Sequence, residues 1–242
     1  METKTAAVSM KNITKTFGPV IANDKVNLDI YKGEILSLLG ENGSGKTTLM
    51  NMLSGIYFPD EGQIFINGRE VVIKSPKDAL KLGIGMVHQH FKLVDVLTAA
   101  ENIVLGLPGK GKLDMKRITE DIQKLADKYG FELDLSQKIY EMSVSQKQTV
   151  EIIKMLYRGA RILILDEPTR GIDVGTKVDI QKLVLKLAGE GMSVTFISSE
   201  TDEMLRTCSR LIVMRDRKVV GELSGEDLTQ NKIMSTIAGG EK

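Results

Sequence analysis

The chain has 242 residues, 42% of them hydrophobic, so it can bury the core of one large domain or of a domain with a smaller lobe. Its 33 basic and 32 acidic side chains are interspersed and sum to a net charge of +1, which predicts no nucleic-acid partner. The single cysteine, Cys208, excludes an internal disulfide and suits a reducing compartment. No run approaches the roughly 18 to 20 apolar residues that span a bilayer, so we expect a soluble protein without direct membrane insertion.

The N-terminal part of the chain predicts strands followed by a helix. Strand-like composition covers 7–17 and 26–40, and the alternation in 62–73 predicts a hairpin whose Asn67-Gly68 pair suits a type I′ turn. Between them, apolar residues recur with the spacing of one helix face from residue 49 to residue 56. This helix begins directly after a glycine-rich segment.

The rest of the chain predicts a helical lobe and then alternating strands and helices. Residues 75–159 are mainly helical in pattern, with no convincing strand after 83–89. The apolar runs 161–168 and 191–200 predict strands buried on both faces, and 210–223 predicts a hairpin. We therefore expect an α/β fold with a mostly parallel sheet, an antiparallel β subdomain and a helical subdomain. In this reading 1–242 is one domain, with 1–74 and 160–242 as the core and β subdomain and 75–159 as the helical subdomain.

The glycine-rich segment matches a phosphate-binding loop. Gly40, Gly45, Lys46 and Thr47 fit the pattern G-x-x-x-x-G-K-[ST] between a predicted strand and a predicted helix. In such a loop the main-chain amides and the helix N-terminus surround phosphate, the lysine reaches the β- and γ-phosphates, and the hydroxyl holds Mg²⁺. The alternative interpretation is a glycine turn with a purely structural role. The expected nucleotide-binding residues here are Gly40, Asn42, Gly43, Ser44, Gly45, Lys46, Thr47 and Thr48.

Two adjacent carboxylates follow the buried strand "ILILD". We expect Asp166 to support Mg²⁺ and Glu167 to polarise a water molecule toward the γ-phosphate. An acidic pair after an apolar strand also occurs as a solvated loop start or a helix cap. Combined with the glycine loop, the pair predicts a site that binds the phosphates of a nucleotide with Mg²⁺ and can direct water at the γ-phosphate.

At these residues the chain resembles the ATP-binding subunits of ABC transporters over nearly its whole length. The resemblance implies that Phe17 stacks on adenine, the alternative being an ordinary core residue, and that Gln89 contacts Mg²⁺ and water and links the helical lobe to the core. His88 beside it has no role in the family, so we expect a surface or packing residue. Asp173 resembles the aspartate of the loop that joins two sites.

The segment "MSVSQKQ", 142–148, resembles the signature that completes the ATP site of a second copy. Ser143, Ser145 and Gln146 are its expected nucleotide contacts, with Ser143 donating to the γ-phosphate across a dimer. The family's partners are then a second ATPase copy, in a homodimer or paired cassette, and transmembrane permease subunits. The implied location is cytoplasmic, peripheral on the inner face of the membrane.

Two departures from the family pattern predict slow or asymmetric hydrolysis with ATP binding retained. Ser145 replaces the usual second glycine of the signature, and its Cβ crowds a backbone that must approach phosphate. Ser199 stands where the family has a histidine that contacts the γ-phosphate, and serine donates one hydrogen bond without carrying charge. We expect Ser199 to take this catalytic position.

Different parts of the chain resemble different relatives within the family. The segments 40–64 and 87–106 resemble the first repeat of double-cassette subunits that import nucleosides or simple sugars, whereas 163–177 and 197–204 resemble the second. The chain is then a single-cassette relative or a join of two cassette halves, with the join between Tyr157 and Ile162. Rival functions are an ATPase of DNA repair or the ribosome, and a nucleotide-binding switch with little hydrolysis. The loop type excludes a protein kinase, and its lysine argues against a dinucleotide oxidoreductase.

Overall fold

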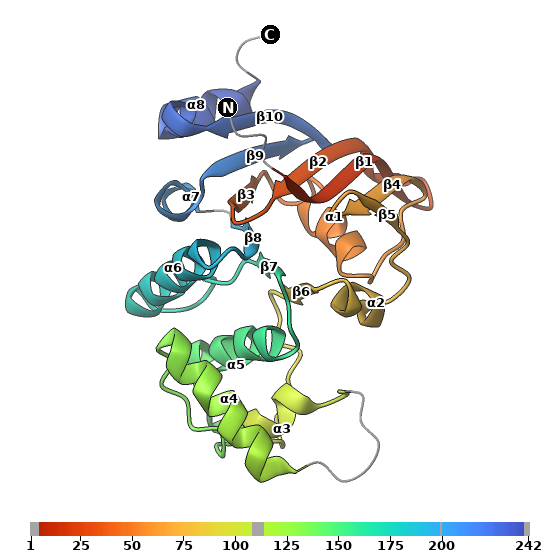
Figure 1. Ribbon diagram of the computed structural model, residues 1–242. Helices are drawn as coiled ribbons and strands as arrows, with labels where there is room; N and C mark the ends of the chain where they lie inside the picture. Colours follow the sequence, from red (N-terminus) through yellow and green to blue (C-terminus); the bar gives the residue numbers. More distant parts are fainter. Residues whose placement is uncertain (1–4, 108–113, 199, 240–242) are drawn as a thin grey trace.

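The computed structural model describes residues 5–107, 114–198 and 200–239, and these contain two β-sheets and a helical lobe (Figure 1). The larger sheet has six strands, parallel except for the pairing of β9 with β10. In spatial order its strands are β10 (Lys218–Ser224), β9 (Arg210–Arg215), β3 (Ile35–Leu39), β8 (Ser193–Ile197), β7 (Ile162–Asp166) and β6 (Ile84–Val87). The predicted α/β class with a mostly parallel sheet is confirmed.

The smaller sheet is antiparallel and comes from the N-terminal part of the chain. Its spatial order is β2 (Val20–Tyr31), β1 (Ala6–Phe17), β4 (Glu61–Ile66) and β5 (Arg69–Val71). Asn67 and Gly68 join β4 to β5 with φ values of 49° and 77°, the left-handed backbone that a type I′ turn requires. The predicted hairpin is therefore confirmed.

Two apolar cores lie on opposite faces of the six-stranded sheet. Along β3, Leu36 and Leu38 join the core shared with the smaller sheet and α1 (Lys46–Leu53), whereas Ile35 and Leu39 join the core on the other face. All five residues of β3 are buried, as the continuous apolar run predicts. The second core receives side chains from α6 (Val174–Gly189), α7 (Thr201–Thr207) and α8 (Gln230–Ala238).

The helical lobe has a core of its own. Its helices α3 (Ala99–Val104), α4 (Met115–Tyr129) and α5 (Val144–Tyr157) pack through Ile103, Ile122 and Ile153 among others, apart from the two sheets (Figure 1). Capping boxes fix the start of α3 at Thr98 and of α5 at Ser143.

Part of the range 75–159 belongs to the main sheet. Strand β6 pairs in parallel with β7, and Ala79 of α2 (Pro76–Lys81) packs in the core between the sheets. No helix in the described part of the chain combines the length and the apolar character needed to cross a bilayer.

Candidate functional site

The glycine loop connects β3 to α1, and two of its glycines have no room for a side chain. Gly40 has φ 158°, and a Cβ built on it would lie 2.1 Å from the carbonyl oxygen of Met214. Gly45 has φ 98°, and its Cβ would lie 2.4 Å from the carbonyl oxygen of Ala22. Because no other amino acid lacks a Cβ, these two positions require glycine for the loop to keep this curve.

Lys46, the first residue of α1, turns its side chain back into the loop. Its Nζ donates to the carbonyl oxygens of Gly40 at 2.6 Å and Glu41 at 2.9 Å, and the residue is 7% exposed. Burial lowers the pKa of Lys46, while the charges of Glu167 and Asp166 oppose that shift. The ammonium therefore lies inside the curve of the loop, where a phosphate group would meet it.

The two carboxylates at the end of β7 point to different partners. Thr47 Oγ1 donates to Asp166 Oδ1 at 3.3 Å, and burial raises the pKa of Asp166, an effect the bond from Thr47 opposes. Glu167 has a left-handed φ of 51°, and its amide donates to the carbonyl oxygen of Ile197 at 2.9 Å. This backbone turn separates the directions of the two side chains, so Asp166 meets the loop hydroxyl and Glu167 meets a cavity.

A cavity of about 400 Å³, which we call the Lys46 cavity, brings most predicted residues together. Phe17 lines it with 43% of its surface exposed and an edge-on contact to Tyr57, 5.0 Å between ring centroids, so Phe17 is not an ordinary core residue. The predicted residues that line the cavity are Phe17, Asn42, Gly43, Gly45, Lys46, Thr47, Thr48, Gln89 and Glu167. Gly40, Ser44 and Asp166 adjoin it through their contacts with Lys46 and Thr47.

The signature residues lie elsewhere, at the start of α5 in the helical lobe. Ser143 is exposed and caps α5, because its Oγ accepts from the amide of Gln146 at 3.2 Å. The hydroxyl hydrogen of Ser143 remains available to a ligand. Ser145 and Gln146 line a different hollow, and none of the three lines the Lys46 cavity. The catalytic position predicted for Ser199 lies outside the described residues.

Asp173 caps α6, the helix that follows the Asp166-Glu167 pair in the chain. Its side chain accepts from the amide of Thr176 at 3.0 Å and from the Thr176 hydroxyl at 2.7 Å, and these bonds lower the pKa of Asp173. An exposed aspartate at this point fixes the start of α6.

Two arginines of the Lys46 cavity, Arg170 and Arg217, were not predicted from the sequence. Arg217 lies in the turn between β9 and β10, far along the chain from the glycine loop. In the sequence, Arg217 stands out only as a turn residue next to Asp216, which does not indicate a binding role. Contact between this turn and β2 is what brings it to the cavity, since the amide of Asp24 donates to the carbonyl oxygen of Arg217 at 3.0 Å.

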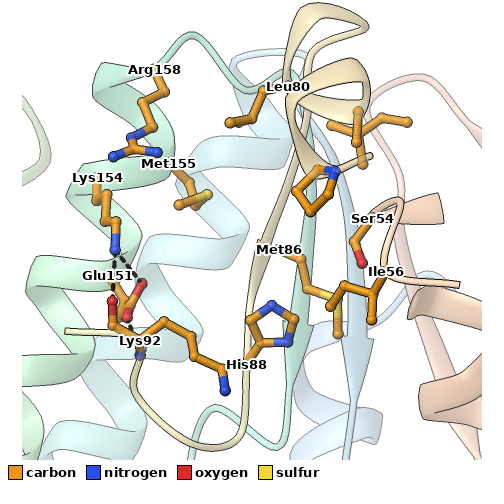
Figure 2. A pocket seen from close by; sticks show the side chains of 13 residues that line it. Ser54, Ile56, Leu80, Met86, His88, Lys92, Glu151, Lys154, Met155 and Arg158 are labelled. Carbon is orange, nitrogen blue, oxygen red and sulfur yellow. Dashed lines mark hydrogen bonds and ion pairs between the residues drawn. The ribbon is translucent and has the colours of Figure 1, made fainter. Parts of the chain in front are cut away.

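A second hollow, which we call the α5 groove, lies between α2, β6 and α5 and holds about 170 Å³ (Figure 2). Figure 2 shows His88 and Met86 facing Met155 and Arg158 across it. Burial lowers the pKa of His88, as do the charges of Lys92 and Lys154. His88 is half-buried, so the expectation of a surface or packing residue is consistent with its position.

Two buried charges of α5 hold the segment that follows Gln89. Glu151 Oε1 accepts from the amide of Lys92 at 2.6 Å, and Lys154 Nζ donates to the carbonyl oxygen of Lys92 at 3.0 Å (Figure 2). The two charged side chains lie 3.6 Å apart, with Glu151 3% and Lys154 8% exposed. A residue three positions after Gln89 is thereby fixed to the helical lobe.

Comparison with known proteins identifies relatives over almost the whole chain. The profile of the ABC transporter family matches residues 23–170, more than half of the sequence. The chain is 44% identical over 236 residues to the guanosine import ATP-binding protein NupO of Bacillus subtilis, covering 97% of this chain and 46% of that protein. It is 39% identical over 236 residues to the ribose import ATP-binding protein RbsA of Clostridium tetani, covering 96% and 47% respectively. The chain spans about half the length of these relatives.

Solved structures share the fold. A nucleotide-free ATP-binding cassette of an ABC transporter superposes with a TM-score of 0.84 at 28% identity, covering 95% of both chains. The dimeric structure of MJ0796, a bacterial ABC transporter cassette, gives a TM-score of 0.79 at 29% identity, covering 90% of this chain and 98% of that one.

Proposed function

Because the chain belongs to the ABC transporter family, we propose that it binds ATP with Mg²⁺ and hydrolyses it to drive uptake of a nucleoside or simple sugar. The observation that carries the proposal is the Lys46 cavity, where Lys46, Thr47, Gln89 and Glu167 surround one space at the glycine loop. The solute class rests on the relatives, which are named for guanosine and ribose import.

The oxygen groups beside the glycine loop suit Mg²⁺. That ion prefers oxygen ligands and usually takes few from protein, the rest coming from water and substrate phosphates. Thr47 and Asp166 bring a hydroxyl and a carboxylate to 3.3 Å of each other, and Gln89 supplies an amide oxygen in the same cavity. Among the described residues no three His, Cys, Asp or Glu side chains gather, which agrees with a site completed by phosphate oxygens. When bound, the ion would neutralise phosphate charge.

Three residues of the chain would act on the nucleotide. Lys46 holds its ammonium in the loop and would stabilise charge on the β- and γ-phosphates. Glu167, turned away from Asp166 by its left-handed backbone, would accept a proton from the attacking water. Gln89 would orient that water from the opposite segment. Phe17 would stack on the base with its exposed ring.

A second cassette would complete the site. Ser143 would donate its hydroxyl hydrogen to the γ-phosphate held by the partner, with Ser145 and Gln146 beside it. The separation of these residues from the Lys46 cavity supports a site shared between two cassettes, as does the likeness to a dimeric cassette. The second cassette is a further copy of this chain or a paired cassette. Ser145 and Ser199, which replace the family's glycine and histidine, would make hydrolysis slow.

The α5 groove beside Gln89 would receive a transmembrane permease subunit. It combines apolar side chains with cations, and Glu151 and Lys154 connect it to the helical lobe. The proposed location is therefore cytoplasmic, at the inner face of the membrane through that partner. In this arrangement the helices α3 to α5 of 75–159 supply the moving helical subdomain, and the remaining described residues, with α2 and β6 among them, supply the core.

Steady-state ATPase assays with Mg²⁺ test the proposal. We expect slow turnover by the purified chain and loss of at least about 100-fold in Glu167→Gln, the order of effect that a positioned general base contributes. Glu226→Gln, which changes an exposed acid outside the cavity, is the matched control. Equal rates in the chain and Glu167→Gln would favour a passive nucleotide switch. Absence of magnesium-dependent ATP binding by calorimetry would contradict the proposal as a whole.

A further inference from the structure

Arg217 occupies a backbone position that is unfavourable for arginine. Strands β9 and β10 are joined by a two-residue turn, Asp216 and Arg217, with φ values of 49° and 69°. Type I′ turns of this kind require positive φ at both positions, and glycine is strongly preferred at the second because it lacks a Cβ. The hairpin alone gives no reason for arginine there. Backbone strain of this sort is often retained where a side chain has a role in function.

The side chain of Arg217 makes no polar contact with the part of the chain that the structure describes. Among residues 5–107, 114–198 and 200–239, its guanidinium has no ion pair and no hydrogen bond. It is exposed and lines the Lys46 cavity. By contrast, its neighbours Arg215 and Lys218 each have an acidic partner, Asp216 and Asp24. An exposed, unpaired cation therefore lines the space proposed for the nucleotide.

The hairpin approaches the cavity from the side of β2. The amide of Asp24 donates to the carbonyl oxygen of Arg217 at 3.0 Å, and Lys218 Nζ lies 2.9 Å from the Asp24 carboxylate. The same strand supplies Val20, Ile21 and Ala22 to the cavity wall, next to Phe17. Gln89 and Glu167 belong to other strand ends of the six-stranded sheet. Arg217 therefore belongs to the same side of the Lys46 cavity as β2 and Phe17.

We propose that Arg217 is a nucleotide-binding residue that contacts the base and ribose of ATP and ADP at the Phe17 end of the Lys46 cavity. This inference rests on the proposed ATP site. A planar guanidinium can lie on the face of an aromatic base or donate to ribose oxygens, and both contacts are common to the two nucleotides. Because they do not involve the γ-phosphate, Arg217 would raise affinity for ATP and ADP to the same degree.

The inference is tested by calorimetry in the presence of Mg²⁺, which measures the affinity of the chain and its variants for ATP, ADP and inorganic tripolyphosphate. We expect Arg217→Gly to weaken ATP and ADP binding by about 3- to 10-fold, the range for a stacked or hydrogen-bonded guanidinium that is partly exposed. Binding of tripolyphosphate, which has no base or ribose, should stay within twofold. Arg206→Ala, which removes an exposed arginine of α7 outside the cavity, is the control and should leave all three affinities within twofold.

We expect the Arg217→Gly variant to fold as the unsubstituted chain does. Since glycine is the preferred residue at this φ, Arg217→Gly should melt at or above the temperature of the unsubstituted chain. ATP affinity within twofold of the unsubstituted chain would overturn the inference while leaving the ATP site intact. An equal loss for tripolyphosphate would also overturn it, by assigning the guanidinium to the phosphates. If the unsubstituted chain itself bound no ATP, the proposed function would fail first.

Discussion

Replacing Glu151 with alanine should disconnect the segment after Gln89 from the helical lobe. Glu151 accepts from the amide of Lys92 and lies 3.6 Å from Lys154, with both charged side chains buried. The substitution removes the acceptor and leaves the Lys154 ammonium without its opposite charge. Figure 2 shows both residues at one end of the α5 groove.

The expected cost is about 3 kcal/mol. Breaking a buried ion pair by removing one partner costs about 3–5 kcal/mol, and a hydrogen bond to a charged group contributes about 1.5–3 kcal/mol. These figures overlap, because one carboxylate makes both contacts, and Lys154 keeps its bond to the carbonyl oxygen of Lys92. For a chain of this size about 3 kcal/mol corresponds to a fall in melting temperature of roughly 6–12 °C.

The cost should decrease at alkaline pH. Burial already lowers the pKa of Lys154 from 10.5, and the charge of Glu151 opposes this shift. Without Glu151 the pKa in the folded state falls further below that of the unfolded state. The unfolded chain then binds more protons below pH 10.5, so stability rises with pH in that window. The deficit of Glu151→Ala should therefore be smaller at pH 10 than at pH 7.

Thermal unfolding of a double-mutant cycle checks this reasoning. Glu151→Ala, Lys154→Met and the double variant give the coupling between the two charges, which we expect to reach at least about 1 kcal/mol. Glu141→Ala, a change at an exposed acid just before α5, is the control. The reasoning is refuted if the single losses add in the double variant, or if Glu151→Ala melts within 2 °C of the parent chain.

Three further outcomes follow from single contacts. Gly45→Ala should abolish ATP binding detectable by calorimetry, because its Cβ would lie 2.4 Å from the Ala22 oxygen at φ 98°, and retained binding would contradict this account of the loop. Glu34→Met should cost about 3 kcal/mol in urea unfolding, because buried Arg210 loses its buried partner and keeps only the exposed Glu222 at 3.1 Å; adding Arg210→Met should restore most of it, and no recovery would argue against the buried ion pair. Bonds from Lys15 and Thr16 lower the pKa of Asp60 from 3.8 to about 2, so its contribution to stability is present above about pH 4 and lost toward pH 2; Asp60→Asn should remove that part of the acid transition, and an unchanged profile would count against it.

Sequence analysis locates the strands that appear as apolar runs of consecutive residues. Every residue of β3, β7 and β8 is buried, so a continuous apolar run marks each of them. The four-residue β6 is fully buried too, and 83–89 is strand-like in the sequence, but its partner β7 lies some 80 residues away in the chain. The predicted lobe 75–159 includes this segment, and the structure pairs it with the main sheet. A pairing over that distance leaves no local mark.

The site likewise has parts that are visible in consecutive residues and parts that depend on contacts between distant segments. Motifs that occupy consecutive residues, such as the glycine loop and the Asp166-Glu167 pair, could be identified because their chemistry depends on neighbours in sequence. Arg217 could not, since the contact of its turn with β2 is what brings it to the cavity. The roles of Glu151 and Lys154 were also missed. A charged pair on a helix ordinarily reads as an exposed face, and only the packed segment at Lys92 makes these two buried.

Helix α5 connects Ser143 physically with the segment at Gln89, which lies more than 50 residues earlier in the chain. Its first turn is capped by Ser143, the proposed contact to a partner's γ-phosphate, and its middle carries Glu151 and Lys154, which hold Lys92 beside Gln89. An uninterrupted helix is stiff over this distance, so a shift of its N-terminus would be transmitted to the segment at Gln89. The contacts of Glu151 lie outside the Lys46 cavity, so Glu151→Ala should lower ATPase activity more than ATP affinity, after allowance for the folded fraction. Equal losses of rate and affinity would mean that α5 only supports the fold.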